Sequence, residues 1–194
     1  MSSTLPNERA CLEILKEEGC SDKVIRHCCI VNSVATRIAK ACNADFELVN
    51  AGSWLHDVGR SRTHGVKHVS EGVVIARARN LPEPLIRIIS RHIAAGFTRE
   101  EAMALGLPDG TYMPETLEEK IVCHSDNLVG DDQVMTLDDA VDELIVRGYS
   151  ITAQRMKAMH EELSEACGAD LDDLIQGSDL VPKALKRCAV YTSR

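Results

Sequence analysis

The chain has few aromatic residues and an acidic balance of charge. Aromatic residues make up 3% of its 194 residues, and the formal net charge is −8. A base-stacking platform needs aromatic side chains, and a broad nucleic-acid surface needs clustered lysines and arginines. The composition therefore argues against an extended nucleic-acid interface and leaves room for a small anionic substrate held by a few local cations.

Long apolar runs are also missing. No stretch approaches the ~20 apolar residues needed to cross a bilayer, and the start, Met-Ser-Ser-Thr-Leu-Pro, lacks a signal-peptide core. Hydrophobic residues at 44% and charged residues at 27% are ordinary for a globular protein. We therefore expect a cytoplasmic protein without a membrane partner.

Cysteine pairs with metal-binding spacing are absent, although the chain contains eight cysteines. No Cys-x-x-Cys motif occurs. Cys11, Cys28, Cys42 and Cys123 fall on apolar helical faces, where a thiol behaves as a small hydrophobic group. Without a secretion signal, reduced structural thiols are expected, and a regulatory role for an exposed thiol stays open.

Strand patterns are scarce, and helical periodicity runs through most of the chain, which predicts an all-α fold. Cap residues, glycines and prolines separate the helical segments. We expect a core over residues 1–130 and a C-terminal helical extension, 131–194, packed on the same domain. The predicted helices lie at about 7–18, 21–41, 45–58, 68–80, 83–95, 98–106, 116–128, 136–147, 152–167 and 170–176, followed by a weakly patterned tail.

The most informative motif is the doublet His56-Asp57, at the end of a predicted helix. Imidazole and carboxylate are the ligands of hydrolytic metal sites. Each further metal-competent residue, taken alone, could be a hydrogen-bonded core histidine or a paired carboxylate. Their occurrence together on separate predicted helices favours a metal site. These residues are His27, His68, His92 and Asp126.

The order His, His-Asp, His, His, Asp resembles the HD superfamily of metal-dependent phosphohydrolases, specifically the HDIG-type subgroup. The resemblance covers about residues 21–130, with the subgroup motif written here as His56-Asp57-Val58-Gly59. It implies an HD-domain-like helical bundle that hydrolyses a phosphomonoester or phosphodiester, such as a nucleotide or an RNA-derived phosphate. The flanking segments that carry the match are His68-Val-Ser-Glu-Gly72, Arg91-His92-Ile-Ala-Ala-Gly96 and Ser125-Asp126-Asn127-Leu128.

The resemblance also implies a role for each ligand. His68 and His92 match the additional ligands of binuclear members, in which Asp57 would bridge two ions. With one ion only, these two histidines would contact substrate or support the ligands. A divalent metal is expected, with two ions and iron or manganese favoured over zinc, cobalt, nickel or magnesium. The shared metal core would be His27, His56, Asp57 and Asp126.

Cations near the doublet are candidates for substrate binding. Arg60 follows it where many HDIG-type proteins have a lysine, and either residue can hold a phosphate. Lys67 and Arg91 are further candidates, and His64 could transfer protons. The predicted catalytic residues are therefore Asp57, Arg60 and His64. One-metal nucleotide phosphohydrolases of the superfamily often carry a glutamate shortly after the doublet; none occurs here, so chemistry would rest on a metal-activated hydroxide.

Other interpretations stay open. The missing glutamate and the cationic segment 60–67 are compatible with a catalytically silent, metal-containing module that binds a nucleotide or regulates a partner. A structural helical protein with incidental histidines is a third interpretation. The Gly-Tyr-Pro segment of cyclic-di-GMP phosphodiesterases is absent, which disfavours that activity. The Met-rich helix 152–167 could pack in a homodimer.

Overall fold

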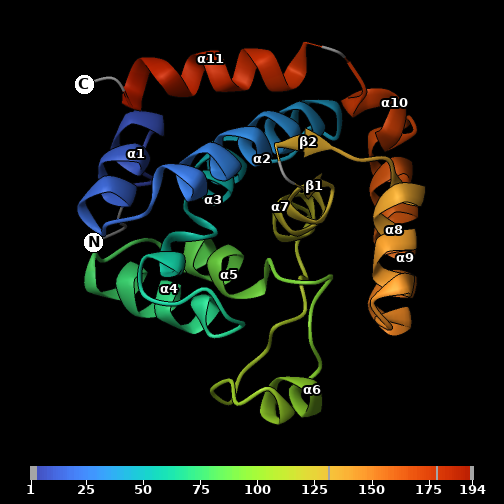
Figure 1. The fold of residues 1–194 in the computed structure, drawn as a ribbon, viewed down its shortest axis with the longest axis horizontal. Helices are drawn as coiled ribbons and strands as arrows, with labels where there is room; N and C mark the ends of the chain where they lie inside the picture. Colours follow the sequence, from blue (N-terminus) through green and yellow to red (C-terminus); the bar gives the residue numbers. More distant parts are fainter. Residues whose placement is uncertain (1–3, 131, 178, 193–194) are drawn as a thin grey trace.

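The computed structural model describes residues 4–130, 132–177 and 179–192. Helices dominate these residues, which confirms the predicted all-α class (Figure 1). The elements are α1 (Glu8–Glu17), α2 (Asp22–Ala41), α3 (Phe46–Leu55), the 3-10 turn η1 (Val58–Ser61), α4 (His68–Ala78), α5 (Glu83–Arg91), α6 (Arg99–Ala104), α7 (Leu117–Asn127), β1 (Val129–Gly130), β2 (Gln133–Val134), α8 (Leu137–Val146), α9 (Ser150–Cys167), α10 (Leu171–Ile175) and α11 (Leu180–Thr192). Within this part of the chain, none of the helices has the length and apolarity to span a membrane.

Capping side chains begin the helices that carry or support the site. Ser21 accepts a hydrogen bond from the backbone N–H of Val24 at the start of α2, and Asp45 accepts one from Leu48 at the start of α3. Each of these bonds satisfies one of the amide groups that a helix leaves unpaired in its first turn. The predicted starts of both helices are thereby confirmed.

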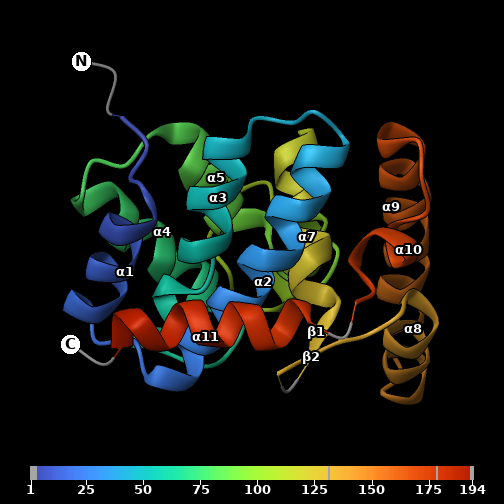
Figure 2. The same ribbon diagram turned by 90° about the horizontal axis from the view of Figure 1, so that it is seen from above.

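Helix α2 forms the centre of the bundle. It packs against α3, α7 and α11, and Figure 2 shows it between α3 and α7 with α11 laid across it. Val31, Ala35 and Ile38 lie on its predicted apolar stripe and are fully buried. This packing fixes the orientation of α2 and places its amino-terminal half beside the end of α3.

The C-terminal tail is helical, which the sequence analysis did not predict. Leu180, Ala184 and Cys188 recur every four residues along α11, and all three are buried. Pro182 lies in the first turn, where a helix does not need its N–H. The hairpin in which Val129 pairs with Val134 was not predicted either.

Helix α5 ends earlier than predicted. It stops at Arg91, and His92 is its C-cap residue, whereas the apolar pattern predicted helix as far as residue 95. Ala94, Ala95 and Gly96 have φ values of 55°, 57° and 87°, in the left-handed region that no α-helix continues through.

A disulfide joins Cys42 to Cys167, and the expectation of reduced thiols is wrong for this pair. Cys42 caps the end of α2 and Cys167 is the last residue of α9, so the packing of these ends brings their Cα atoms to 4.0 Å. A separation of 125 residues leaves no spacing pattern in the sequence to indicate the pairing. The other six cysteines, all buried, are free of disulfides.

Breaking this disulfide is expected to lower the free energy of unfolding by about 2–4 kcal/mol, since it closes a long loop in the unfolded chain. The measurement is a denaturant titration of wild type and of the double variant Cys42→Ser/Cys167→Ser, each with and without a reductant. Wild type should lose stability on reduction and the double variant should not respond. A wild-type protein that is indifferent to the reductant would contradict the pairing.

Candidate metal centre

The six predicted metal ligands converge on one site although they come from five separate helical elements. His27 lies on α2, His56 caps α3 and Asp57 follows it; His68 begins α4, and His92 caps α5. Asp126 completes the site from α7. Their ligand atoms lie within 4.8 Å of one another in three overlapping groups: His27 with His56 and Asp57, His56 with His92 and Asp126, and Asp57 with His68 and His92.

Asp57 divides the site into two halves. Its Oδ1 lies 3.2 Å from His68 Nε2 and 3.4 Å from His92 Nε2. Its Oδ2 faces the other way, 3.9 Å from His27 Nε2 and 3.8 Å from His56 Nε2. One carboxylate thus presents one oxygen to each histidine pair, which is the geometry of a ligand that bridges two ions.

Asp126 lies closest to the half around His27 and His56, although its carboxylate is also within 4.8 Å of a His92 ring nitrogen. Its Oδ1 lies 2.8 Å from His27 Nε2 and 3.3 Å from His56 Nε2. The half around His27 and His56 therefore contains two carboxylates, and the half around His68 and His92 contains only the shared one.

Backbone carbonyls fix the tautomers of three of the histidines. In each, Nδ1 lies 2.8 Å from the carbonyl oxygen three residues earlier. Because a carbonyl can only accept, Nδ1 carries the proton and the neutral ring keeps its lone pair on Nε2. The acceptors are Ser53 for His56, Gly65 for His68 and Ile89 for His92.

The donor atoms fit a cation. His56 Nε2 and Asp57 Oδ1 are buried and have no hydrogen-bond partner. His68 Nε2 and His92 Nε2 lie only 3.0 Å apart, with both of their Nδ1 atoms already protonated against carbonyls. Buried lone pairs that face one another are costly unless a cation or proton satisfies them. Divalent metal ions bound by these imidazoles and carboxylates would satisfy all of them at once.

The charges at the site shift the pKa values of His56 and Asp57 toward their charged forms. Burial would lower the pKa of His56, but the carboxylates of Asp57 and Asp126 outweigh it and raise this pKa to about 9. Burial would likewise raise the pKa of Asp57, but His56, His68 and His92 hold it well below its usual range. The Asp57 carboxylate is therefore ionised and available to a metal.

Gly59 allows the turn after the doublet to lie directly on α4. A Cβ atom at this position would come 1.9 Å from the carbonyl oxygen of His68 and 2.5 Å from the backbone nitrogen of Gly72. Backbone atoms cannot yield as a flexible side chain can. The glycine of the doublet motif therefore keeps Asp57 within reach of His68.

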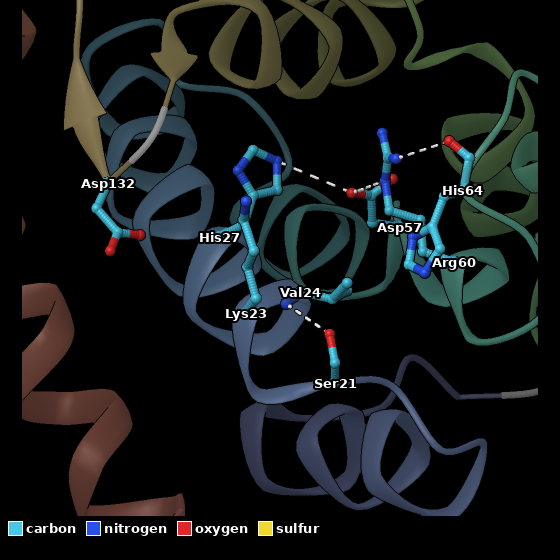
Figure 3. Close-up of a pocket in the computed structure, with 8 residues that line it drawn as sticks. All are labelled: Ser21, Lys23, Val24, His27, Asp57, Arg60, His64 and Asp132. Atoms are coloured by element: carbon cyan, nitrogen blue, oxygen red, sulfur yellow. Dashed lines mark hydrogen bonds and ion pairs between the residues drawn. The ribbon is translucent and has the colours of Figure 1, made fainter.

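A cavity of about 440 Å³ opens beside the metal centre (Figure 3). Arg60 and His64, two of the predicted catalytic residues, line it together with Asp57. The Arg60 Nε donates to Asp57 Oδ2 over 2.5 Å, and its Nη1 donates to the carbonyl oxygen of His64 over 3.4 Å. The remaining lining residues are Ser21, Lys23, Val24, His27 and Asp132.

Two of the predicted substrate-binding cations lie outside this cavity. Arg91 is buried, and its Nη1 lies 2.9 Å from a carboxylate oxygen of Glu115 and 2.8 Å from one of Glu119, so its charge is neutralised within the fold. Lys67 lies beside Gly106, in the turn after α6. Neither residue is among those that line the cavity.

Lys23, which was not among the predicted substrate-binding residues, also lines the cavity. The signal was present in the chain, because Lys23 precedes the ligand His27 by four residues and therefore shares its helix face. His124, near the ligand Asp126 in the sequence, is fully buried instead, with its Nε2 3.1 Å from His160 Nδ1.

The comparisons with known proteins point to one family. A model of the HD domain matches residues 24–131. A protein of Picrophilus torridus named tRNA (cytidine(56)-2'-O)-methyltransferase is 45% identical over 170 residues, which are 88% of this chain and 50% of that protein. Its namesake in Thermoplasma volcanium is 41% identical with the same coverage. The chain thus spans about half the length of these two curated relatives. The Methanocaldococcus jannaschii protein MJ0778 is 47% identical over 67% of this chain and 79% of its own length.

The fold also resembles a solved structure. The HD domain of the Listeria monocytogenes phosphodiesterase PgpH superposes with a TM-score of 0.51 at 17% identity, covering 81% of this chain and 97% of that one. Its complex with cyclic-di-AMP gives a TM-score of 0.53 at 18% identity, covering 86% and 97%. At this level of identity, the likeness concerns the fold alone.

Proposed function

The chain belongs to the HD domain family, and from this premise we propose that it is a metal-dependent phosphohydrolase acting on a phosphomonoester or phosphodiester. The observation that carries the proposal is the placement of Asp57, which directs one oxygen to His68 and His92 and the other to His27 and His56. Six ligands shared in this way suit two divalent ions, with iron or manganese as the first choices.

The ligands have distinct places in this proposal. His27, His56 and Asp126 would hold one ion, His68 and His92 the other, and Asp57 would contribute to both. Bound ions would supply a nucleophile from water at neutral pH and neutralise charge that develops on the phosphoryl group. No glutamate follows His56-Asp57 in the sequence to act as an acid or base. In this proposal the metal ions would supply both the nucleophile and the neutralising charge instead.

The cavity residues Arg60 and His64 would bind the substrate and exchange protons with it. With metal ions bound at Asp57, the guanidinium of Arg60 would be available to pair with a phosphate, for which its forked donors are suited. His64 lines the same cavity and would exchange a proton with the leaving oxygen. These two residues would bind and orient the substrate at the open face of the metal centre.

The names of the curated relatives suggest which substrates to test first. This chain matches only half of the tRNA methyltransferases' length, and its clustered imidazoles and carboxylates offer a hydrolytic centre. The name of an RNA-modifying protein nevertheless supports RNA-derived phosphates, alongside nucleotides, as the first substrates to test. A module that binds such a ligand without turnover is the alternative.

A metal-by-substrate screen tests the proposal. Freshly purified protein, handled without oxygen, is assayed with iron, manganese, zinc, cobalt, nickel or magnesium. The substrates are nucleoside monophosphates, cyclic nucleotides and short RNAs with 3'-phosphate or 2',3'-cyclic phosphate ends. We expect release of phosphate or opening of the cyclic phosphate with iron or manganese. Stoichiometric metal and tight nucleotide binding without turnover would favour the silent module instead.

A further inference from the structure

We propose that Lys23 binds a second anionic group of the substrate, so that the preferred substrate carries two phosphate groups rather than one. This inference rests on the proposed function, because it takes one of the two phosphates to lie at the metal centre. It adds a specificity-determining residue and a substrate class to that site.

The position of Lys23 supports this role. It lies in the first turn of α2, one turn before His27, and it lines the same cavity. Figure 3 shows its side chain running along the helix with the ammonium end toward the His27 ring. Lys23 is exposed, and its ammonium forms no ion pair or hydrogen bond with the described residues. Its charge is therefore available to a ligand.

The second cation of the cavity, Arg60, lies against the Asp57 carboxylate. Arg60 extends from η1, and Figure 3 shows Asp57 between it and Lys23. A phosphate at the metal ions and Arg60 would leave Lys23 to contact a different group of the same molecule. Two cations at different places in one cavity match a ligand with two anionic groups.

The lining of the cavity is mostly polar and suits phosphate recognition. Val24 is the only wholly apolar side chain among the lining residues, which include the cations Lys23 and Arg60. Lysine and arginine both bind phosphate groups. A volume of about 440 Å³ is in the range of small-molecule sites, so the cavity has room for a second phosphate.

The negative charge of Asp132 does not neutralise the positive charge of Lys23. Asp132 also lines the cavity, but its carboxylate lies 2.5 Å from the guanidinium of Arg26 and is neutralised there. Apart from the ligand Asp57, Asp132 is the only carboxylate among the lining residues. A second phosphate near Lys23 would thus meet an unopposed positive charge.

The test compares adenosine 5'-monophosphate with adenosine 3',5'-bisphosphate on wild type and Lys23→Gln. We expect the variant to raise KM for the bisphosphate about tenfold, the effect of ~1.4 kcal/mol, with kcat unchanged. KM for the monophosphate should change less than twofold. Lys23→Arg should restore most of the loss, and Lys157→Gln, which removes an exposed lysine of α9 outside the cavity, should match wild type.

Calorimetric binding of the bisphosphate to the manganese-loaded protein separates this inference from the proposed function. If neither compound is hydrolysed, the proposed function fails for these substrates, and about tenfold weaker binding to Lys23→Gln would still support the second anionic site. Equal effects of Lys23→Gln on both compounds, or none on either KM or binding, would overturn it. Unchanged thermal unfolding of Lys23→Gln shows that its fold is intact.

Discussion

Asp57→Asn is expected to remove both metal ions at once and to lower kcat by about a thousandfold or more, which corresponds to ~4 kcal/mol of transition-state stabilisation. The reason is the position of the carboxylate, with Oδ1 at the His68 and His92 pair and Oδ2 at the His27 and His56 pair. Asparagine keeps the shape of the side chain but loses the negative charge and one of the two ligand oxygens. Each half of the site would then hold an ion less tightly.

Two further variants distinguish a bridging ligand from an ordinary one. Asp126→Asn should reduce the occupancy of the first ion more than that of the second, because Asp126 Oδ1 lies closest to His27 and His56. His92→Ala should reduce the occupancy of the second ion more than that of the first, since its Nε2 lies closest to Asp57 Oδ1 and His68. Metal content by mass spectrometry after dialysis would show a loss of two, one and one ions in the three variants.

Asp173→Asn is the matched control, because it removes an exposed carboxylate of α10 outside the metal-competent groups. It should retain full metal content and activity. If Asp57→Asn kept its metals and its turnover, the proposed centre would be wrong. If it lost one ion and retained the other at full occupancy, the carboxylate would not bridge two sites.

The candidate ligands were predicted as a set because their order along the chain resembles the HD superfamily, and local sequence signals then place them on helices. His56 and His68 lie at helix ends, where cap residues and glycines indicate the boundary, and the spacing of apolar residues indicates which helix carries His27 and Asp126. Which oxygen of Asp57 faces which histidine depends on how α3, α4 and α7 pack. That arrangement is a property of the assembled bundle and cannot be obtained from any one segment.

The residues that were missed depend on contacts between distant segments. Cys42 and Cys167 pair across 125 residues, and nothing near either cysteine indicates the other. The α11 residues Leu180, Ala184 and Cys188 recur every four positions in the sequence, but the tail was interpreted as weakly patterned. Arg91 was predicted to bind substrate because it adjoins His92, and its carboxylate partners lie more than twenty residues further along the chain.

Glu119, the buried partner of Arg91, gives the second prediction with a large effect. Glu119→Ala is expected to lower the free energy of unfolding by about 3–5 kcal/mol. Glu119 is 2% exposed, and its Oε2 accepts hydrogen bonds of 2.8 Å from Arg91 Nη1 and from the backbone N–H of Glu115. Its Oε1 accepts one of 3.2 Å from Arg87 Nε. Alanine would leave the buried guanidinium of Arg91 with the exposed carboxylate of Glu115 as its remaining carboxylate partner, beside the carbonyl oxygen of Thr111.

Differential scanning calorimetry should show a melting temperature lower by roughly 10 °C for Glu119→Ala, given about 2–4 °C per kcal/mol in a domain of this size. Glu143→Ala removes an exposed i,i+4 partner of Arg147 and should change stability by less than about 1 kcal/mol. Equal effects of the two substitutions would show that the buried pair is no more important than a surface pair. An intermediate loss is expected for Glu119→Gln, which keeps the shape and one acceptor.

The same carboxylate should make stability depend on pH in the acid range. Burial would raise the pKa of Glu119, but the N–H of Glu115 and the guanidinium of Arg91 outweigh it and lower this pKa below its usual 4.5. A carboxyl whose pKa is lowered by folding contributes stability above its unfolded pKa and loses it as the pH falls through its folded pKa. Wild type should therefore lose stability below about pH 4.5 more steeply than Glu119→Gln does. Glu119 holds Arg91, which directly precedes the candidate ligand His92. We therefore expect Glu119→Ala to bind the second metal ion more weakly at neutral pH.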